Sequence, residues 1–334
     1  MLDHALTKAV VDLFLTKLFL NLRDNNPDRL PFIEQFAPIV GDSVPPVLLH
    51  LIERMKRNNR WMTIVNHLIE KTDELALKEL ISHLIVQAYL IGKEMISQHE
   101  NQFGFLIPFV ITYDLNREEP FYLHKRNVES IVTEAEGIGI YLHQFILYHP
   151  KLSLRQVLDI AHHHPNSLFI LCVEPQTITL NVVQSLKPLN HVLLFLQMEP
   201  YSAFQDALSL LKRTRKPIGG FVRIGNQQLE SYLTERHLSQ LVADGIHLQL
   251  LIPQRQHRFD QTLIEKVNQK SPYPVLSVDA RAMVQDMGRS LFGIAREFTI
   301  YSSGRCVADK GKTGFLNNRS LLNVLKEIMP RKIK

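Results

Sequence analysis

FLIPFVITY (105–113) and GIYLHQFILY (139–148) open a series of six short apolar runs, and this series decides the fold class. The other four are SLFILCV (167–173), HVLLFLQM (191–198), PIGGFVRI (217–224) and GIHLQLLI (245–252). Segments with apolar residues at helical spacing lie between them, near 124–136, 153–164, 178–187, 202–215 and 229–244. Strands that alternate with helices predict repeated right-handed βαβ units and a parallel sheet. The periodicity leaves open whether this sheet closes into a barrel.

Both flanks of the series have a different pattern. Residues 1–100 have apolar residues three and four apart, which predicts helices, in HALTKAVVDLFLTKLFLNL (4–22), PPVLLHLIERMKRNNRWMTIVNHLIEK (45–71) and DELALKELISHLIVQAYLIGKEMISQ (73–98). After residue 255 the pattern predicts a strand in YPVLSVDA (273–280), a hairpin in FTIYSSGRCVA (298–308) and a helix in NNRSLLNVLKEI (317–328). We therefore expect a helical N-terminal domain over 1–100 and a small C-terminal module over 256–334.

The composition is that of a soluble globular protein, with 45% hydrophobic and 21% charged residues in 334. A membrane span needs about 20 predominantly apolar residues, and the run at 10–20 is broken by Asp12 and Lys17, so neither a span nor a signal peptide is expected. Two cysteines cannot build a disulfide framework and favour a reducing, cytoplasmic location. The net charge of +5 is scattered apart from RMKR (54–57), KRTR (212–215) and the tail RKIK, which favours solvated helix faces over a specific nucleic-acid site.

The stretch VITYDLNREEPFYLHKRN (110–127) follows the first strand and resembles the opening loop of radical S-adenosylmethionine enzymes. In that family a strand ending in Thr runs into C-x-x-x-C-x-x-C, whose thiolates hold a [4Fe–4S] cluster that binds S-adenosylmethionine. Aligned on Thr112, Asn116 and Pro120, the cysteine positions are Leu115, Glu119 and Tyr122. The spacing is kept and the ligands are replaced. Because such a cluster needs soft thiolates, we expect no cofactor, and S-adenosylmethionine binding without a cluster stays a minor alternative.

Other landmarks of the family fall at matching places in altered form. LYHP (147–150) resembles the motif that ends the second strand, CVEP (172–175) lies at the third, and QMEP (197–200) keeps the glutamate of the fourth. The tail from 298 to 325 is similar to a SPASM/Twitch-type auxiliary module, in which Cys306 matches one cluster ligand. The resemblance spans about 105–330 and identifies the chain as a degenerate member of the superfamily. It implies an α/β fold with a (β/α)6 partial TIM-like barrel over 105–255.

Functional groups of parallel α/β folds gather at the carboxyl ends of the strands. The polar residues expected there as a candidate binding site at the barrel mouth are His149, Glu174, Gln197, Glu199, Arg223, Asn226 and Gln249. They could form a pocket or an acid/base pair, or a structural ion-pair network across a disused cavity. His162, His163 and His164 point about 100° apart on a helix and cannot share one metal ion, so we expect charges at a helix end and no metal site.

The spacing of the three cysteine positions is kept, although every cluster ligand is replaced. This combination predicts a non-catalytic pseudoenzyme that acts as a binding, scaffold or regulatory partner in a biosynthetic pathway. The expected partner is a protein or peptide, which could be an active radical S-adenosylmethionine relative. A second interpretation is an enzyme with repurposed, non-radical chemistry at the mouth carboxylates, with an oxygen-ligated metal at Glu119 and Glu199. A third is a peripheral protein that uses basic N-terminal helices to bind a membrane surface, lipid or nucleic acid.

Overall fold

One sheet of ten strands organises the part of the chain that the computed structural model describes, namely residues 59–115, 120–148, 151–254 and 258–331 and helical positions between 9 and 20. Glu119, His149, Pro150, the RMKR run and the last three residues lie outside the described residues, as does most of the predicted helix that begins at 45. The strands are β1 (Val110–Leu115), β2 (Leu142–Leu147), β3 (Leu168–Val173), β4 (Val192–Gln197), β5 (Ile218–Ile224), β6 (Leu248–Pro253), β7 (Leu276–Asp279), β8 (Phe298–Tyr301), β9 (Arg305–Ala308) and β10 (Thr313–Phe315).

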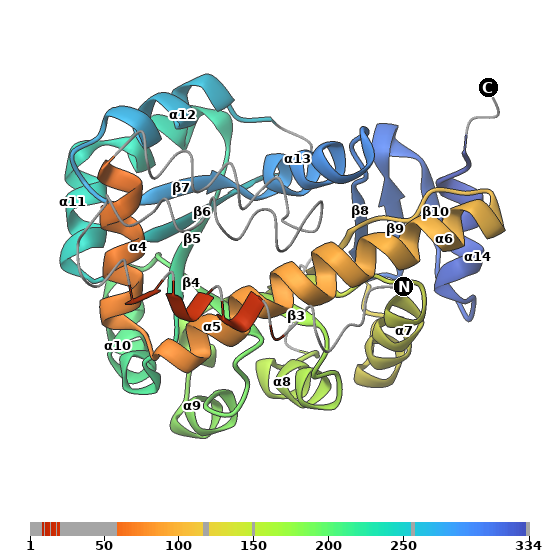
Figure 1. The fold of residues 1–334 in the computed structure, drawn as a ribbon, viewed down its shortest axis with the longest axis horizontal. Helices are drawn as coiled ribbons and strands as arrows, with labels where there is room; N and C mark the ends of the chain where they lie inside the picture. Colours follow the sequence, from red (N-terminus) through yellow and green to blue (C-terminus); the bar gives the residue numbers. More distant parts are fainter. Residues whose placement is uncertain are drawn as a thin grey trace.

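Helices cover the outer face of the sheet and its amino end (Figure 1). Before β1 come α4 (Asn59–Lys71), α5 (Glu74–Ser82), the π-helix η3 (His83–Gly92) and α6 (Lys93–Phe103). The crossover helices are α7 (Lys125–Gly137), α8 (Leu154–His163), η4 (Pro175–Thr177), α9 (Leu180–Leu186), α10 (Tyr201–Leu211), η5 (Lys212–Thr214), η6 (Asn226–Leu233), α11 (Glu235–Ala243), α12 (Gln261–Lys270) and α13 (Ala280–Phe292). The short η7 (Asp309–Gly311) and α14 (Leu321–Ile328) follow.

The strand order is β10-β9-β8-β1-β2-β3-β4-β5-β6-β7. All neighbours from β8 through β1 to β7 are parallel, and β9 and β10 form an antiparallel hairpin beyond β8. This is the order of an eight-stranded α/β barrel in which, among the described residues, β7 and β8 do not pair. The prediction of an α/β fold with a largely parallel sheet is confirmed.

The C-terminal segment differs from the expected separate module. Instead of building a sheet of its own, the segment adds β7 to the far edge beside β6 and returns through α13 to place β8 beside β1. The βα series therefore continues for two strands beyond the six that were predicted. The hairpin of β9 and β10 then extends the same sheet.

A side chain explains why the free edge of β7 takes no further strand. The Asn268 amide donates to the Ser277 carbonyl at 2.7 Å and accepts from the Ser277 N–H at 3.0 Å. Both backbone groups of Ser277 that face away from β6 are thus satisfied by an amide that imitates a neighbouring strand. An edge blocked in this way is protected against further pairing, and the barrel stays open between β7 and β8.

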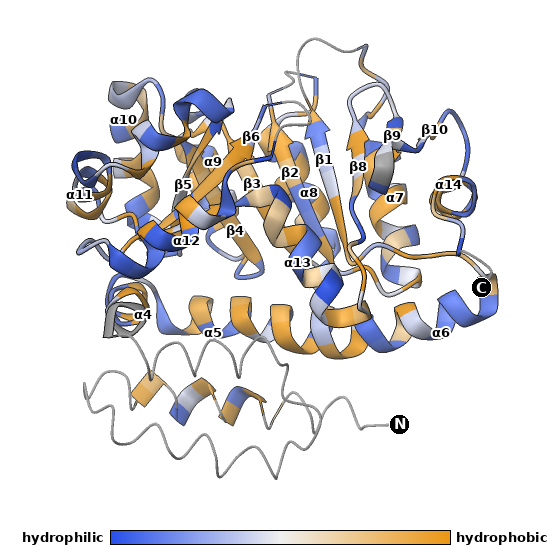
Figure 2. Cartoon of the chain, turned by 90° about the horizontal axis from the view of Figure 1, so that it is seen from above, coloured by the Kyte–Doolittle hydropathy of each residue, from blue (hydrophilic) through white to orange (hydrophobic). Residues whose placement is uncertain are grey.

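One continuous helix, Glu74–Phe103, runs across the amino ends of the strands (Figure 2). His83 lies 2.7 Å from the carbonyl of Pro165 before β3, and Asp73 N–H donates to the Arg215 carbonyl before β5. The helix is long and apolar enough for a membrane span by length and composition, but half of its apolar window is buried inside the molecule. Its contacts with the strand ends account for its apolar composition.

Two glycines set how closely this helix approaches the sheet. A Cβ atom on Gly92 would lie 2.6 Å from the carbonyl oxygen of Gly139, which precedes β2. Gly139 itself has φ of 91°, a conformation that L side chains rarely adopt. The close contact holds the helix against the amino end of the barrel, so functional groups are expected at the opposite end, where the strands finish.

Candidate functional site

The inner face of the barrel can be followed from the strand register. Residues that are direct partners in neighbouring strands point to the same side, so Thr112 pairs with Gln144 and Asp114 with Ile146. Asp114 contacts Arg223 of β5, although β2, β3 and β4 lie between their strands in the sheet. Such a contact is possible only through the barrel interior, which places both residues on the inner face at the carboxyl ends of their strands.

Asp114 and Arg223 form a bidentate ion pair across the barrel mouth. Arg223 Nη1 donates to Asp114 Oδ1 and Nη2 to Oδ2, both at 2.9 Å. The side chains are 22% exposed for Arg223 and 13% for Asp114, so water screens the pair only partly. The guanidinium carbon of Arg223 lies 5.7 Å from the centre of the Tyr148 ring, which follows β2. These three residues link β1, β2 and β5, and we call them the mouth strut.

The mouth strut keeps its charges. Burial acts to lower the pKa of Arg223, but the charge and hydrogen bonds of Asp114 outweigh burial and leave that pKa raised. Burial raises the pKa of Tyr148, opposed by Arg223 and assisted by Cys172, Glu174 and Asp114. The mouth strut is therefore a charged pair beside a neutral phenol, with each charge neutralised by its neighbour.

A second polar group lies at the end of β4. The Tyr232 hydroxyl donates to Glu199 Oε1, and the rings of Tyr232 and His237 meet edge to face with centres 5.2 Å apart. Burial raises the pKa of Tyr232 and the bond to Glu199 raises it further. Burial lowers the pKa of His237, with Glu199 partly opposing. Glu199 is exposed, so this group faces solvent at the rim.

Gln249 belongs to this second group and points away from the barrel interior. Its side-chain N–H groups donate to His237 Nε2 at 3.0 Å and to the Tyr232 carbonyl at 3.3 Å, while its oxygen accepts from Ser277 Oγ at 2.9 Å. In the register Gln249 pairs with Gly220 and Ser277, which alternate with the inward residues of their strands. Gln249 therefore supports α11 and does not line the cavity with Arg223.

The remaining predicted residues lie at or after the ends of three different strands, β3, β4 and β5. Glu174 caps η4 near Tyr148, Gln197 ends β4 half-buried, and Asn226 is exposed at the start of η6. Sequence reasoning missed Asp114, Tyr148, Tyr232 and His237. Asp114 could have been predicted as a site residue, because it is the only charged residue of β1. Tyr232 and His237 lie in a segment whose pattern predicts only a helix.

The two described positions that the sequence aligns with cluster cysteines, Leu115 and Tyr122, carry no thiol. Leu115 is the fully buried last residue of β1 and pairs with Leu147. Tyr122 donates its hydroxyl to Asn318 Oδ1 at 3.1 Å and accepts from the Asn318 N–H at 2.7 Å. Burial raises the pKa of Cys306 to about 12 and also raises that of Cys172, so both stay thiols on separate strands. Among the described residues, no three His, Cys, Asp or Glu side chains gather where they could hold a metal ion.

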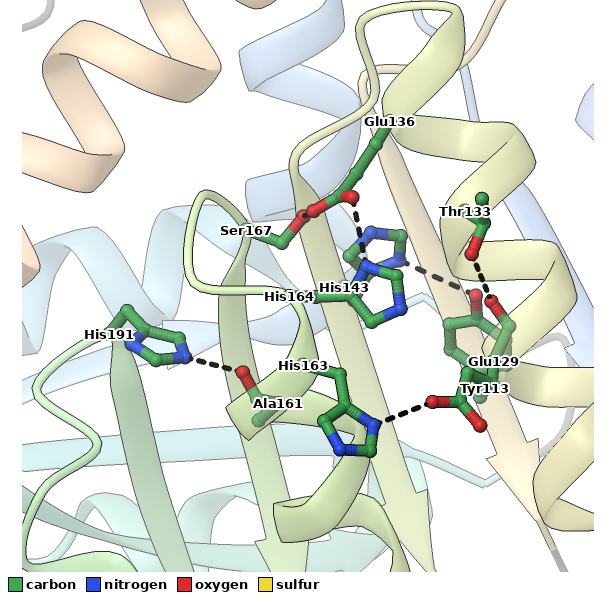
Figure 3. Close-up of polar contacts among 10 residues, drawn as sticks. All are labelled: Tyr113, Glu129, Thr133, Glu136, His143, Ala161, His163, His164, Ser167 and His191. Carbon is green, nitrogen blue, oxygen red and sulfur yellow. Dashed lines mark hydrogen bonds and ion pairs between the residues drawn. The ribbon is translucent and has the colours of Figure 1, made fainter.

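The histidine run ends α8 and its members contact different partners (Figure 3). His163 Nδ1 lies 2.7 Å from Glu129, and His164 Nδ1 lies 2.9 Å from Glu136, both on α7. Ser167 Oγ also donates to Glu136, at 2.6 Å. The contacts join α7 to α8 outside the sheet, consistent with the divergent directions expected for consecutive helical residues.

Behind these pairs, two buried histidines make the stability of the fold depend on pH. Burial lowers the pKa of His143 to about 3, with a contribution from His164. Burial lowers that of His191 to about 4, and the Ala161 carbonyl partly opposes. Histidine in the unfolded chain has a pKa of about 6.5. The unfolded state therefore binds more protons between these values, and stability falls as the pH drops below about 6.5.

We expect the free energy of unfolding to fall by up to about 1.4 kcal/mol per pH unit from each of these histidines between pH 6 and 4.5. Urea unfolding at several pH values measures this slope. The variant His143→Gln should lose one histidine's share of it, whereas His162→Gln, exposed at the end of α8, should keep the full slope. Equal slopes in the two variants would show that His143 is not buried in its neutral form.

The comparisons with known proteins give structural likenesses only. No family model and no curated protein matches the chain. Among solved structures, anSMEcpe with bound AdoMet has 12% identity and a TM-score of 0.42, covering 66% of this chain and 81% of that one. A mutant tryptophan synthase α-subunit from the hyperthermophile Pyrococcus furiosus has 11% identity and a TM-score of 0.40, covering 66% of this chain and 96% of that one.

Proposed function

We propose that the chain is a radical S-adenosylmethionine-like barrel without radical chemistry, a pseudoenzyme that binds a partner protein or peptide as a scaffold or regulator in a biosynthetic pathway. One observation carries the proposal. Tyr122, which aligns with the third cysteine, has its hydroxyl engaged twice by Asn318, and Leu115, which aligns with the first, is buried in β1. Both positions serve packing and loop attachment, while a cluster would need thiolates there.

The mouth strut supports a binding role over a catalytic one. Asp114 and Arg223 satisfy each other's hydrogen bonds, and their pairing crosses the space in which a substrate of the family would be expected. Both oxygens of the Asp114 carboxylate accept hydrogen bonds from Arg223, so the carboxylate is already engaged within the protein. The pair stabilises the mouth as a surface and leaves its outer rim for contacts.

The rim carries side chains of the kind that dominate protein interfaces. Lys151 Nζ lies 6.0 Å from the centre of the Phe121 ring, and the guanidinium carbon of Arg305 lies 4.2 Å from the centre of the Tyr301 ring. Both aromatic residues are half-buried: Tyr301 ends β8, and Phe121 precedes α7. The Tyr122 N–H donates to the Ser302 carbonyl, which places the two residues on the same side of the mouth. Aromatic and arginine residues provide most hot spots of protein interfaces. A partner with acidic and apolar groups fits this rim, and an active relative of the same superfamily could supply such a surface.

Anaerobic reconstitution with iron and sulfide tests the absence of a cluster. We expect no stoichiometric iron and no iron–sulfur absorbance, because the described cluster positions offer no thiolate. The variant Cys172→Ser/Cys306→Ser is the matched control, since iron that it retains cannot be thiolate-bound. Stoichiometric iron in the native chain that is lost in this variant would overturn the proposal and make the protein a cluster-binding enzyme.

Panning a random peptide display library against the full chain tests the binding role. We expect enriched peptides rich in Asp and Glu whose affinity falls about tenfold in Arg305→Gln, the size of effect of one charged hot-spot contact. Arg236→Gln, exposed on α11, should bind them unchanged. No enrichment, or equal affinity for both variants, would contradict a partner site at this rim.

A second candidate function is an enzyme with repurposed, non-radical chemistry. The contact of Glu199 with Tyr232, beside His237, favours it, because a carboxylate, a phenol and an imidazole together can move protons. A bell-shaped pH dependence of any turnover, abolished in Glu199→Gln, would favour this candidate over the pseudoenzyme.

A further inference from the structure

A small cavity lies outside the barrel, between α7 and the segment that leads into α14. Its volume is about 270 Å³, and its polar lining residues are Tyr122, Asn127, Ser130, Glu134, Asn318, Arg319 and Ser320. Figure 1 shows α7 and α14 side by side on the same flank of the molecule, and α14 packs on α7. Cavities that hold drug-sized ligands measure roughly 300–1,000 Å³. This one therefore suits a smaller molecule.

The walls of the cavity are held by bonds that do not use the cavity itself. The Tyr122 hydroxyl binds both the N–H and the side-chain oxygen of Asn318, which has a left-handed backbone with φ of 63°. Glu134 Oε2 accepts from the Leu321 N–H at 2.7 Å. Arg319 pairs with Glu327 at 2.6 Å. A site whose side chains are already held in place loses little entropy when a ligand binds.

The lining offers both hydrogen-bond donors and hydrogen-bond acceptors to a ligand. Glu134 Oε1 can still accept and Asn318 Nδ2 can still donate, because the hydrogen bonds of these two side chains use their oxygens Oε2 and Oδ1. Within the described residues, the side chains of Asn127 and Ser130 make no hydrogen bond, and both residues carry donors and acceptors. The cavity thus offers a mixed set of donors and acceptors on neighbouring walls.

The charges of the lining balance. Glu134 is the acidic residue and Arg319 the basic one, so the formal charges of the lining sum to zero. Each already has a partner, the Leu321 N–H for Glu134 and Glu327 for Arg319. An anion would meet Glu134 and a cation would meet Arg319, so the lining favours neither class of ion. Hydroxyl groups both donate and accept, which matches a mixed, neutral lining.

We propose that this cavity binds a neutral polyhydroxylated molecule of monosaccharide size. The inference goes beyond the proposed partner binding, because the cavity is lined by residues other than those of the rim at Arg305 and its ligand does not depend on a partner at that rim. Tyr122 takes part in it as a wall residue, so the position that aligns with a cluster cysteine helps to build a new site.

Saturation-transfer NMR on the full chain, with D-glucose, D-mannose, D-galactose, D-ribose and myo-inositol tested one at a time, decides the question. We expect transfer to at least one of them and an affinity about tenfold weaker in Asn127→Ala, the effect of one lost hydrogen-bonding side chain. Arg126→Ala, exposed beside it on α7, is the control and should bind within about twofold of the native chain.

Acetate is tested in the same way, and inorganic phosphate, which has no carbon-bound proton, is tested by calorimetric titration; thermal melts show that each variant is folded. Transfer to none of the five probes would overturn the proposal, and so would transfer that is equal in the Asn127→Ala and Arg126→Ala variants. Binding of phosphate or acetate without any polyol would assign the cavity to anions and overturn the ligand class. These results are independent of iron content and peptide binding.

Discussion

Replacing Arg296 with methionine should lower the free energy of unfolding by about 3–5 kcal/mol, because Glu100 would remain buried without its partner. The two side chains are only 5% and 7% exposed. Arg296 Nη1 and Nη2 bind the two carboxylate oxygens of Glu100, and Nη1 also donates to the Ile107 carbonyl at 3.1 Å. The pair joins α6 to the segments that enter β1 and β8. Urea unfolding at neutral pH measures the loss.

A double variant separates the value of this ion pair from the cost of breaking it. Burial raises the pKa of Glu100 despite the Ile107 N–H and Arg296, and burial lowers that of Arg296 despite Glu100. Desolvation therefore opposes both charges. We expect Glu100→Leu/Arg296→Met to be more stable than Arg296→Met alone, since an apolar pair replaces an unpaired buried charge.

The matched control is an exposed ion pair on α13. Arg289 contacts Asp286 at 2.7 Å, with both side chains more than half exposed. Arg289→Met should change stability by less than about 1 kcal/mol, as exposed pairs do. If Arg296→Met costs no more than this control, the buried pair is not needed for stability and the account of how α6 is attached is wrong.

The alternation of short apolar runs and helical segments was enough to predict most of the fold. Each of the six runs between 105 and 252 overlaps a strand of the sheet. The order of the last strands could not be derived in this way, because it depends on distant contacts. Asn268 blocks the edge of β7, and β8 pairs with β1 almost 190 residues earlier in the chain. The local hydrophobic periodicity of the sequence can predict neither the blocked edge of β7 nor the pairing of β8 with β1.

The candidate site was predictable only in part, for a related reason. Arg223 and Glu199 were predicted as site residues because they lie at strand ends. The structure places their side chains at the mouth and at its rim. The same criterion also selected Gln249, whose side chain faces the helices. Both faces of a parallel strand are buried, so polar and apolar residues do not alternate along it and the sequence does not show which face is inward. The partner of Arg223 lies 109 residues away, so sequence spacing could not reveal it.

The mouth strut should be the second large contributor to stability. Replacing Arg223 with methionine should lower the free energy of unfolding by about 2–3 kcal/mol, because Asp114 would lose both hydrogen bonds while staying mostly out of water. The effect should be smaller than at Arg296, because Arg223 is 22% exposed and Asp114 13%, so water can reach the remaining carboxylate. Urea unfolding gives the magnitude.

Hydrogen exchange shows whether the mouth strut braces the mouth or only adds to stability. Because Asp114 and Arg223 join strands that the sheet separates, their loss should speed exchange at the ends of β1 and β5 and leave β3 unchanged. Lys125→Met, which removes a more exposed pair with Asp159 between α7 and α8, is the control for a salt bridge of ordinary kind. Uniform acceleration over all strands would mean that the pair acts on global stability alone. Acceleration confined to the mouth would make it the element that holds the rim in shape for a partner, so that Arg223→Met should also weaken peptide binding without touching the rim residues themselves.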